Sequence, residues 1–323
     1  MSGKNSGRWG GEPSLYDRVA MEASSVVIRR YSTSFGLASR LLAQPVRQDV
    51  ENIYALVRLA DEVVDGVAAS ASLDRVEIER RIDALERETC SAMSCGYSTN
   101  LVVHAFGWTA RRVGIGEDLT APFFRSMRAD ISETRHTPDS FDDYVYGSAE
   151  VVGLMCLAAF LKGVPVTPTQ HATLVDGACH LGAAFQKINF LRDLAADFGT
   201  LGRSYFPGID VTTFTEAEKK RIIADIDEDL RIARASLPGL PTTSRRAVVL
   251  AQGLFEELTG RLRDTPAAVL ARTRVRVPNP VKARIAAGAA LGRLPRSSLP
   301  RRATAEHTPS GPAGRYAEGD TIE

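Results

Sequence analysis

One stretch of this 323-residue chain, from Gly182 to Pro207, limits the fold more than any other. Within it Asn189, Asp193 and Asp197 are four residues apart, and on an α-helix this spacing places their side chains along one face. A row of carboxylate and carboxamide oxygens suits a hard divalent cation. Because buried carboxylates without partners are costly, the sequence predicts a helix whose acidic face borders a cation site.

A second acidic pair lies upstream in YALVRLADEVVDG, where Asp61 and Asp65 are again one helical turn apart and Arg58 precedes them. Taken alone, this pattern is typical of a solvated helix face with salt bridges. The surrounding residues favour a partly buried face instead, because they are apolar: Leu56, Leu59, Ala60, Val63 and Val64. If the two helices face each other, four carboxylates and a carboxamide surround a space that magnesium ions and a diphosphate would fill.

The rest of the chain indicates an all-α globular protein. Apolar residues make up 44% and the formal net charge is +1, which excludes a polyelectrolyte. No Gly-rich phosphate loop or dinucleotide fingerprint interrupts the helical periodicity. The most apolar run, Val151 to Leu161, is too short to cross a bilayer as a helix, and the start of the chain lacks the apolar segment of a secretory signal. Four cysteines without Cys-x-x-Cys spacing are expected to be reduced thiols in a cytosolic protein: Cys90, Cys95, Cys156 and Cys179.

Helices are predicted wherever apolar residues recur at helical spacing between turn signals. The long acidic helix should run from Thr169 to Phe198 and end at Gly199, and a Thr215–Glu218 capping box should begin a later helix. Hydroxyl residues at 32–34 should interrupt the first helical stretch. The remaining helices are expected at 15–42, 48–64, 72–95, 100–113, 122–133 and 245–262.

Both acidic stretches resemble the two aspartate-rich helices of the squalene and phytoene synthase family, and they are most similar to those of bacterial phytoene synthases. Asp61, Glu62 and Asp65 resemble the family's Asp-x-x-x-Asp. The later stretch resembles Asn-x-x-x-Asp-x-x-x-Asp, and GRSYFP after it is similar to Gly-Arg-x-Tyr-x-Pro. Two such motifs about 125 residues apart make a chance match very unlikely. The resemblance implies a single-domain isoprenoid-synthase helical bundle around a central apolar cavity, spanning 14–293 between disordered tails at 1–13 and 294–323.

The resemblance also implies roles for individual residues. Asp61, Asp65, Asp193 and Asp197 would be catalytic, and together with Asn189 they would bind Mg²⁺, with Mn²⁺ as an alternative and no NADPH. The implied substrate-binding residues are Ser32, Ser34, Arg58, Tyr144, Tyr146, Gln186, Asn189 and Tyr205. As cations, Arg58, Lys187, Arg192 and Arg203 are also expected to contact the diphosphate directly.

Several of these assignments have a structural alternative. Ser32 and Ser34 could cap or bend a helix instead of contacting substrate. The helix containing Tyr144 and Tyr146 departs from the family pattern, because Glu150 stands where glycine is commonest, so plain helix packing is an equal interpretation there.

The implied activity is that of a prenyltransferase. It would condense two geranylgeranyl diphosphates head to head, through a cyclopropyl (prephytoene) diphosphate, to phytoene, releasing two diphosphates in carotenoid biosynthesis. Squalene or dehydrosqualene formation from two farnesyl diphosphates is the alternative, because spacing does not reveal pocket depth. A non-catalytic helical subunit of the same fold is disfavoured, because all five metal-binding positions are present.

The C-terminal part of the chain is basic, with nine Lys or Arg residues and no acid from Arg272 to Arg302. It would suit peripheral contact with anionic lipid, although a solvated tail explains it equally well. Nucleic acid is not an expected partner, because the whole chain is nearly neutral and the basic run lacks interleaved aromatic residues. We therefore expect a cytoplasmic enzyme with prenyl diphosphate substrates and peripheral membrane contact.

Overall fold

Local capping signals set many of the helix ends in the computed structural model, which describes residues 12–66, 71–201 and 203–292. The Ser14 hydroxyl accepts a hydrogen bond from the Asp17 amide and begins the first helix, and Thr215 does the same with the Glu218 amide at a later one. Gly96 and Gly114 adopt left-handed conformations (φ 79° and 89°), which end two further helices.

The helices follow one another with short connections, and the described residues contain no β-strand. In chain order they are α1 (Leu15–Tyr31), α2 (Ser34–Ser39), α3 (Val46–Val64), α5 (Arg75–Cys95), α6 (Leu101–Val113), α7 (Glu117–Ser132), α8 (Pro138–Val145), the π-helical turn η1 (Tyr146–Glu150), α9 (Val151–Leu161), α10 (Pro168–Leu201), η2 (Val211–Thr213), α11 (Glu216–Ser236), η3 (Leu237–Gly239), α12 (Thr242–Asp264), α13 (Ala267–Leu270) and α14 (Asn279–Ala290).

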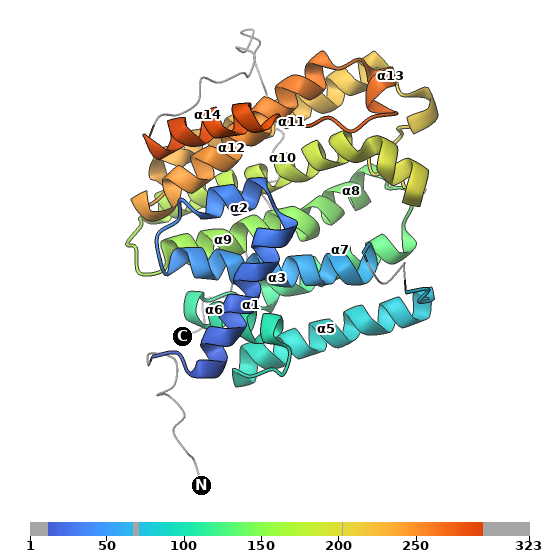
Figure 1. Cartoon of the computed structure of the whole chain (residues 1–323). Coiled ribbons are helices and arrows are strands. Elements are labelled where there is room, and N and C mark those ends of the chain that lie inside the picture. The colour runs from blue at the N-terminus through green and yellow to red at the C-terminus, as the bar shows by residue number, and fades with distance from the viewer. Residues whose placement is uncertain (1–11, 67–70, 202, 293–323) are drawn as a thin grey trace.

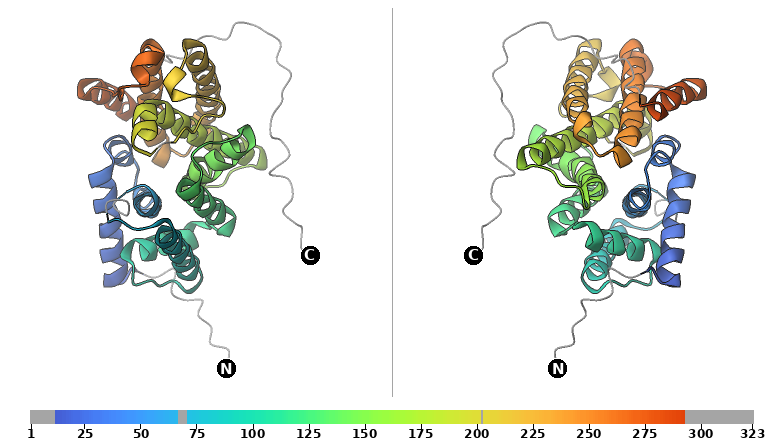
Figure 2. Two further views of the ribbon diagram at one scale, coloured as in Figure 1. Left: turned by 90° about the vertical axis from the view of Figure 1, so that its right-hand side faces the viewer. Right: turned by 90° about the vertical axis from the view of Figure 1, so that its left-hand side faces the viewer.

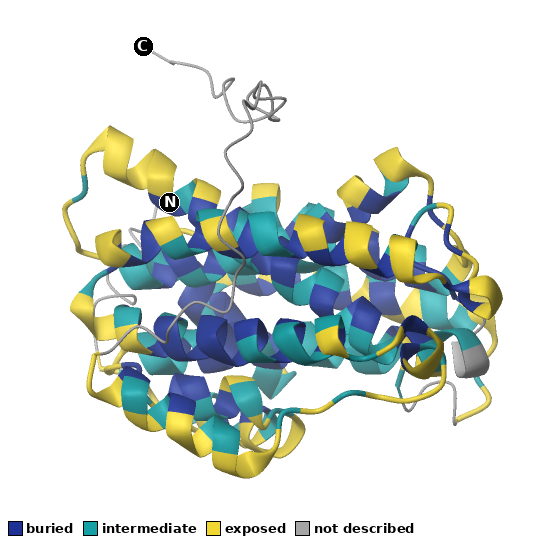
Figure 3. Ribbon diagram, turned by 90° about the horizontal axis from the view of Figure 1, so that it is seen from above, coloured by how far each residue is buried: buried dark blue, intermediate teal, exposed yellow. Residues whose placement is uncertain are grey.

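The helices lie roughly side by side in two halves (Figure 1). One apolar core lies among α3, α5, α6, α7 and α9, and two more lie around α10 to α14, with contributions from α2, α8 and α9. Viewed along the bundle, α1 to α3 lie on one side and the green α8, η1 and α9 on the other (Figure 2). Buried positions lie on the inward faces and exposed ones on the periphery (Figure 3).

Helix α10 packs against α11, η1, α9 and α12 and therefore joins the two sides of the bundle. Its approach to η1 is very close at Gly182, where an added Cβ would lie 2.6 Å from the Ala149 carbonyl oxygen. Only glycine permits this distance without a backbone shift. The contact fixes how α10 lies against the opposite wall.

A continuous helical segment, Pro138–Leu161, is long and apolar enough to cross a membrane by length and composition, with a hydropathy of 1.6, although only 39% of it is buried. The segment packs against α3, α7 and α10 inside the bundle. Its less buried side includes Val152, Cys156 and Phe160, which line an internal cavity. Its apolar character is therefore explained by its place in the bundle.

The all-α prediction is confirmed, and so is the helix break at residues 32–34. Several predicted bounds were wrong by three to five residues. Helix α10 continues through Gly199 to Leu201, and α7 begins at Glu117, with Pro122 inside it. Residues 1–11 and 293–323, which make up nearly all of the predicted tails, lie outside the described residues.

Candidate active site

A cavity of about 980 Å³ runs through the bundle and is acidic at one end and apolar at the other. At the acidic end both predicted motifs line it: Asp61 and Asp65 from α3 and its C-terminal cap, and Asn189, Asp193 and Asp197 from α10. Leu174 lines the apolar end, and the stretch of α10 between it and Asp197 is about 35 Å long at 1.5 Å per residue. The long helix therefore carries both the acids and the apolar wall.

The first acidic motif lies at the end of α3. The Asp61 carboxylate is 3.8 Å from the Arg58 guanidinium, which also forms an ion pair with Glu62 and lies 4.5 Å from the centre of the Tyr31 ring. The Asp61 side chain is 37% exposed, but it lines the cavity, where burial and the neighbouring Asp65 and Glu62 raise its pKa to about 7. The Arg58 guanidinium opposes this shift but does not cancel it, so the negative charge of Asp61 is only partly compensated.

The second motif faces it from α10. Arg192 Nε donates to Asp193 Oδ1 at 3.0 Å, and Arg274 Nε reaches the same oxygen at 2.7 Å. Burial raises the pKa of Asp197 to about 6, and the charges of Asp193 and Asp65 add to this shift. Because Asp65 belongs to α3, the two motifs interact electrostatically across the cavity.

A buried polar network lies behind the acids. Arg203 Nη1 donates to Asp65 at 2.6 Å and to the Tyr205 hydroxyl at 3.1 Å, and Arg203 also bonds the Asp130 carbonyl. The Tyr144 hydroxyl donates to both Asp130 oxygens at 2.8 and 2.9 Å. Burial, with Asp65 nearby, raises the pKa of Asp130 above its ordinary range. The network connects α3, α7, α8 and the chain after α10.

The acidic residues fit a divalent cation that takes some of its ligands from the protein and the others from a substrate. Their donors are all oxygen. Burial, together with the charges of the neighbouring carboxylates, raises the pKa of Asp61 and Asp197, and a bound cation would offset both effects. Within the described part of the chain, however, no three His, Cys, Asp or Glu side chains converge closely enough to hold a metal by themselves. Mg²⁺ is commonly bound by one or two carboxylates with substrate phosphates completing the shell, so this spread is consistent with binding together with a diphosphate.

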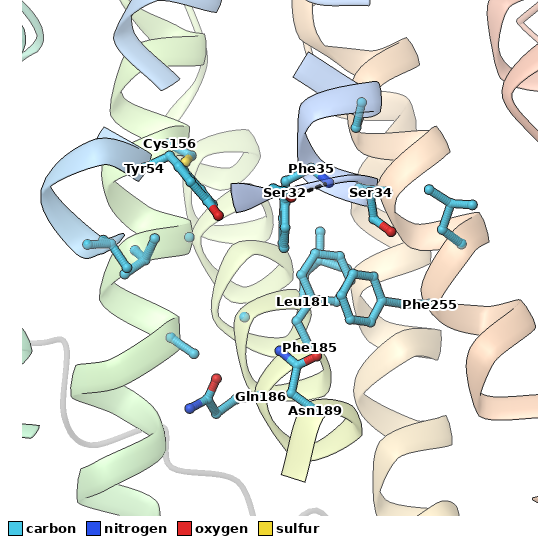
Figure 4. A pocket seen from close by; sticks show the side chains of 18 of the residues that line it. Ser32, Ser34, Phe35, Tyr54, Cys156, Leu181, Phe185, Gln186, Asn189 and Phe255 are labelled. Atoms are coloured by element: carbon cyan, nitrogen blue, oxygen red, sulfur yellow. Dashed lines mark hydrogen bonds between the residues drawn. The ribbon is translucent and has the colours of Figure 1, made fainter. Parts of the chain in front are cut away.

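Beyond the acids the cavity is lined mainly by apolar and aromatic side chains. Phe185 of α10 stacks on Phe255 of α12 with ring centroids 3.8 Å apart, and Phe35 of α2 lies 5.6 Å from Phe185 (Figure 4). The Gln186 and Asn189 amides lie below these rings in the same view. The aromatic group therefore separates the polar end from the deeper apolar end.

Most of the predicted site residues line this cavity, including Ser32, Ser34, Tyr144 and Tyr205. Ser32 also accepts a hydrogen bond from the Phe35 amide at 3.0 Å, so it has the local capping role as well. Arg203 does not line the cavity but contacts Asp65, which does.

Two predicted substrate contacts, Tyr146 and Lys187, do not line the cavity. Lys187 lies only two residues from Asn189, which is about 200° round a helix, and its Nζ contacts Asp225 and Asp229 of α11 at 2.6 and 2.8 Å. Tyr146 belongs to the π-helical turn and packs beside the apolar core among α3, α5, α6, α7 and α9. The structure therefore separates these two side chains from the rest of the site.

Sequence reasoning missed the role of the segment after α13. Arg274, Val275, Arg276 and Val277 all line the cavity, and Arg274 contacts the central acid of the second motif. The only signal was the basic composition of this region, which was interpreted as a membrane-binding or solvated end. Asp130 is also buried and lines the cavity.

A helical bundle with two facing acidic motifs at the end of a long apolar cavity defines an isoprenoid-synthase fold. Solved structures agree: a dehydrosqualene synthase matches with a TM-score of 0.73 at 20% identity, covering 87% of this chain and 99% of that one. A squalene synthase from Alicyclobacillus acidocaldarius matches with a TM-score of 0.66 at 18% identity, covering 82% and 99%. These likenesses support the fold.

Sequence comparison identifies the family. The family model described as "Squalene/phytoene synthase" matches residues 28–280, and the chain belongs to this family. A 15-cis-phytoene synthase of Enterobacter agglomerans is 30% identical over 251 residues, which is 70% of this chain and 80% of that protein. One from Pantoea ananas is 28% identical over 248 residues, covering 70% and 77%. The prediction of a prenyltransferase of this family, similar to bacterial phytoene synthases, is confirmed.

Proposed function

We propose that this enzyme joins two geranylgeranyl diphosphates head to head, through a cyclopropyl (prephytoene) diphosphate, to give phytoene and two diphosphates. One observation carries this proposal: the same cavity has carboxylates suited to bind a divalent cation at one end and a long apolar wall at the other. Its volume of about 980 Å³ is at the top of the range of roughly 300–1,000 Å³ for small-molecule sites, which supports a large hydrocarbon substrate. The names of the bacterial relatives support the product.

The acidic residues would hold the metal. Mg²⁺, with Mn²⁺ as the alternative, would supply positive charge that makes a diphosphate a better leaving group. The residues that would hold it are Asp61 and Asp65 on one wall and Asn189, Asp193 and Asp197 on the other.

The chain's own cations would orient the diphosphates. Arg58 and Arg192 line the acidic end, where a guanidinium can bind two phosphate oxygens at once. The hydroxyls of Ser32 and Ser34 also line the cavity and would donate hydrogen bonds to the anionic group. Arg203 would act indirectly, because it positions Asp65 and Tyr205.

The aromatic and aliphatic residues would exclude water. A carbocation formed at the acidic end would face Phe35, Phe185 and Phe255 instead of solvent, so that it is preserved for bond formation. The π-faces of aromatic rings also attract cations. No reductant is required for phytoene, and we propose that NADPH is not used.

We also propose that the enzyme is cytoplasmic and contacts membranes peripherally. The hydrocarbon product and the basic run beginning at Arg272 support this location.

The test is to incubate the purified chain with Mg²⁺ and either farnesyl or geranylgeranyl diphosphate, without NADPH, and identify the extracted hydrocarbon by mass spectrometry. We expect phytoene from geranylgeranyl diphosphate and none when EDTA removes the metal. Dehydrosqualene from farnesyl diphosphate as the preferred reaction would move the enzyme to the alternative branch. Absence of any product would support the non-catalytic alternative.

A further inference from the structure

Residues 273–278 form an extended segment, here called the strap, that connects α13 to α14 across the cavity. Its side chains alternate in exposure. Val275 and Val277 are half-buried and pack against the apolar core around α10, whereas Arg274 and Arg276 are exposed. The strap is therefore seated by two valines and presents two arginines at the edge of the cavity.

Arg274 binds the central acid of the second motif with two donors. Its Nε lies 2.7 Å from Asp193 Oδ1 and its Nη2 lies 3.2 Å from Oδ2, so the guanidinium uses both carboxylate oxygens. The Arg274 side chain is 49% exposed and that of Asp193 is 20% exposed. An ion pair with this much solvent contact is weak, so another cation can replace it.

The far end of the strap is attached independently. Lys282, in the first turns of α14, donates to Thr33 Oγ1 at 3.4 Å, and α14 packs on α12. Release of Arg274 would therefore loosen the strap, which Val275 and Val277 still hold against the core, without detaching α14 from the bundle.

We propose that Arg274 is a latch: it occupies the metal-binding oxygens of Asp193 in the metal-free enzyme, and a divalent cation must displace it. The inference rests on the proposed function, because it requires Asp193 to be a metal ligand. Arg192, next to Asp193 on α10, donates to the same two oxygens. The two oxygens cannot serve both guanidiniums and the metal fully at once. The Arg274 side chain is the more exposed of the two (49% against 22%), so it is the one that the metal would release, and metal binding and strap release are coupled. By linkage, whatever weakens the latch strengthens metal binding by the same factor.

The test measures Mn²⁺ binding to the full chain without substrate, by electron paramagnetic resonance of free Mn²⁺. Under these conditions one or two of the acids would hold the ion weakly, with water completing its ligands. Arg274→Gln should bind Mn²⁺ about threefold more tightly than the unchanged protein, the order expected for loss of an exposed ion pair. Arg276→Gln is the matched control, because it removes the same charge from the same strap two residues away. Its affinity should stay close to that of the unchanged protein.

Hydrogen exchange of the strap amides supplies a second readout that does not depend on activity. Mn²⁺ should speed exchange at residues 273–278 in the unchanged protein, and in Arg274→Gln exchange should already be fast without metal. Equal Mn²⁺ affinity in all three proteins, or slower strap exchange with Mn²⁺, would overturn the latch alone. If Asp193→Asn binds Mn²⁺ as well as the unchanged protein does, the metal assignment in the proposed function fails, and the latch fails with it.

Discussion

Arg203 and Asp65 are 138 residues apart in the chain, yet the guanidinium donates to the carboxylate at 2.6 Å. The Arg203 side chain is almost fully buried, and it also bonds Tyr205 and the Asp130 carbonyl. This one side chain therefore connects the end of α3 to the segment after α10. The two acidic motifs belong to these same two parts of the chain, so Arg203 helps to set their separation.

Replacing Arg203 with methionine should lower the free energy of unfolding by about 3 kcal/mol, because it leaves the buried Asp130 and the Asp65 carboxylate without their cation. Urea denaturation followed by circular dichroism measures this change. Arg75→Met is the control, because Arg75 pairs with Glu79 on the exposed face of α5 and should cost at most about 1 kcal/mol. Equal losses in the two variants would contradict the structural role of Arg203.

Replacing Asp61 or Asp193 with asparagine should reduce kcat by about 100-fold or more, equivalent to about 2.7 kcal/mol. The fold should survive, since removing one of several repelling carboxylates does not weaken the bundle. Product formation at saturating Mg²⁺ and a thermal unfolding scan measure the two effects. Glu22→Gln, on the exposed side of α1, should leave both unchanged. A near-normal rate in Asp61→Asn and Asp193→Asn would refute their assignment as metal ligands.

Replacing Ala251 with phenylalanine should shift the substrate preference toward farnesyl diphosphate. Ala251 lines the cavity one turn from Phe255, on the apolar side of the aromatic group, so a larger side chain would occupy space needed by the longer prenyl chain. We expect kcat/KM for geranylgeranyl diphosphate to fall about tenfold relative to farnesyl diphosphate. Ala235→Phe, at an exposed position of α11, is the matched control. An unchanged preference would show that this part of the cavity does not hold the chain.

The stability of the enzyme should fall as pH rises from about 5 to about 8, partly because of Glu150. Burial, followed by the charge of Asp229, raises the Glu150 pKa to about 7 in the folded protein, despite opposing effects of His180 and Lys187. The folded state therefore binds more protons than the unfolded state in this window, and stability decreases as those protons are lost. Glu150→Gln should remove on the order of 2 kcal/mol of this decrease.

Thermal unfolding at several pH values would measure the Glu150 contribution. Glu79→Gln, an exposed acid of α5, should leave the pH dependence unchanged. A Glu150→Gln variant with the same pH dependence as the unchanged enzyme would contradict the buried carboxyl as its source.

Local periodicity accounts for most of what the sequence predicts. The four-residue spacing of Asn189, Asp193 and Asp197 determines their shared face, and the structure places that face at the cavity. The same period puts Lys187 on the other side of α10, against Asp225 and Asp229. Its assignment to the substrate rested on its positive charge beside the second acidic motif, and helical geometry would have argued against it.

Contacts between distant segments were beyond prediction from local pattern. Arg274 reaches Asp193 across 81 residues, and nothing in the basic run distinguishes it from its neighbours. The end of α10 was misjudged for a different reason: Gly199 is a frequent helix terminator, but a helix can continue through glycine where its surroundings support it.

The distribution of cavity residues over the helices affects how this enzyme could be altered. Helix α10 carries both the acids and several apolar residues of the cavity wall. A shift of this helix would therefore disturb diphosphate ionisation and binding of the prenyl chain together. The lining residues of α12 are all apolar: Ala247, Val248, Ala251, Leu254, Phe255 and Leu258. Under the proposed function, substitutions on α12 should change the length of the hydrocarbon product while the acids on α3 and α10 stay in place. Helix α12 is therefore the one to randomise when a different hydrocarbon is wanted.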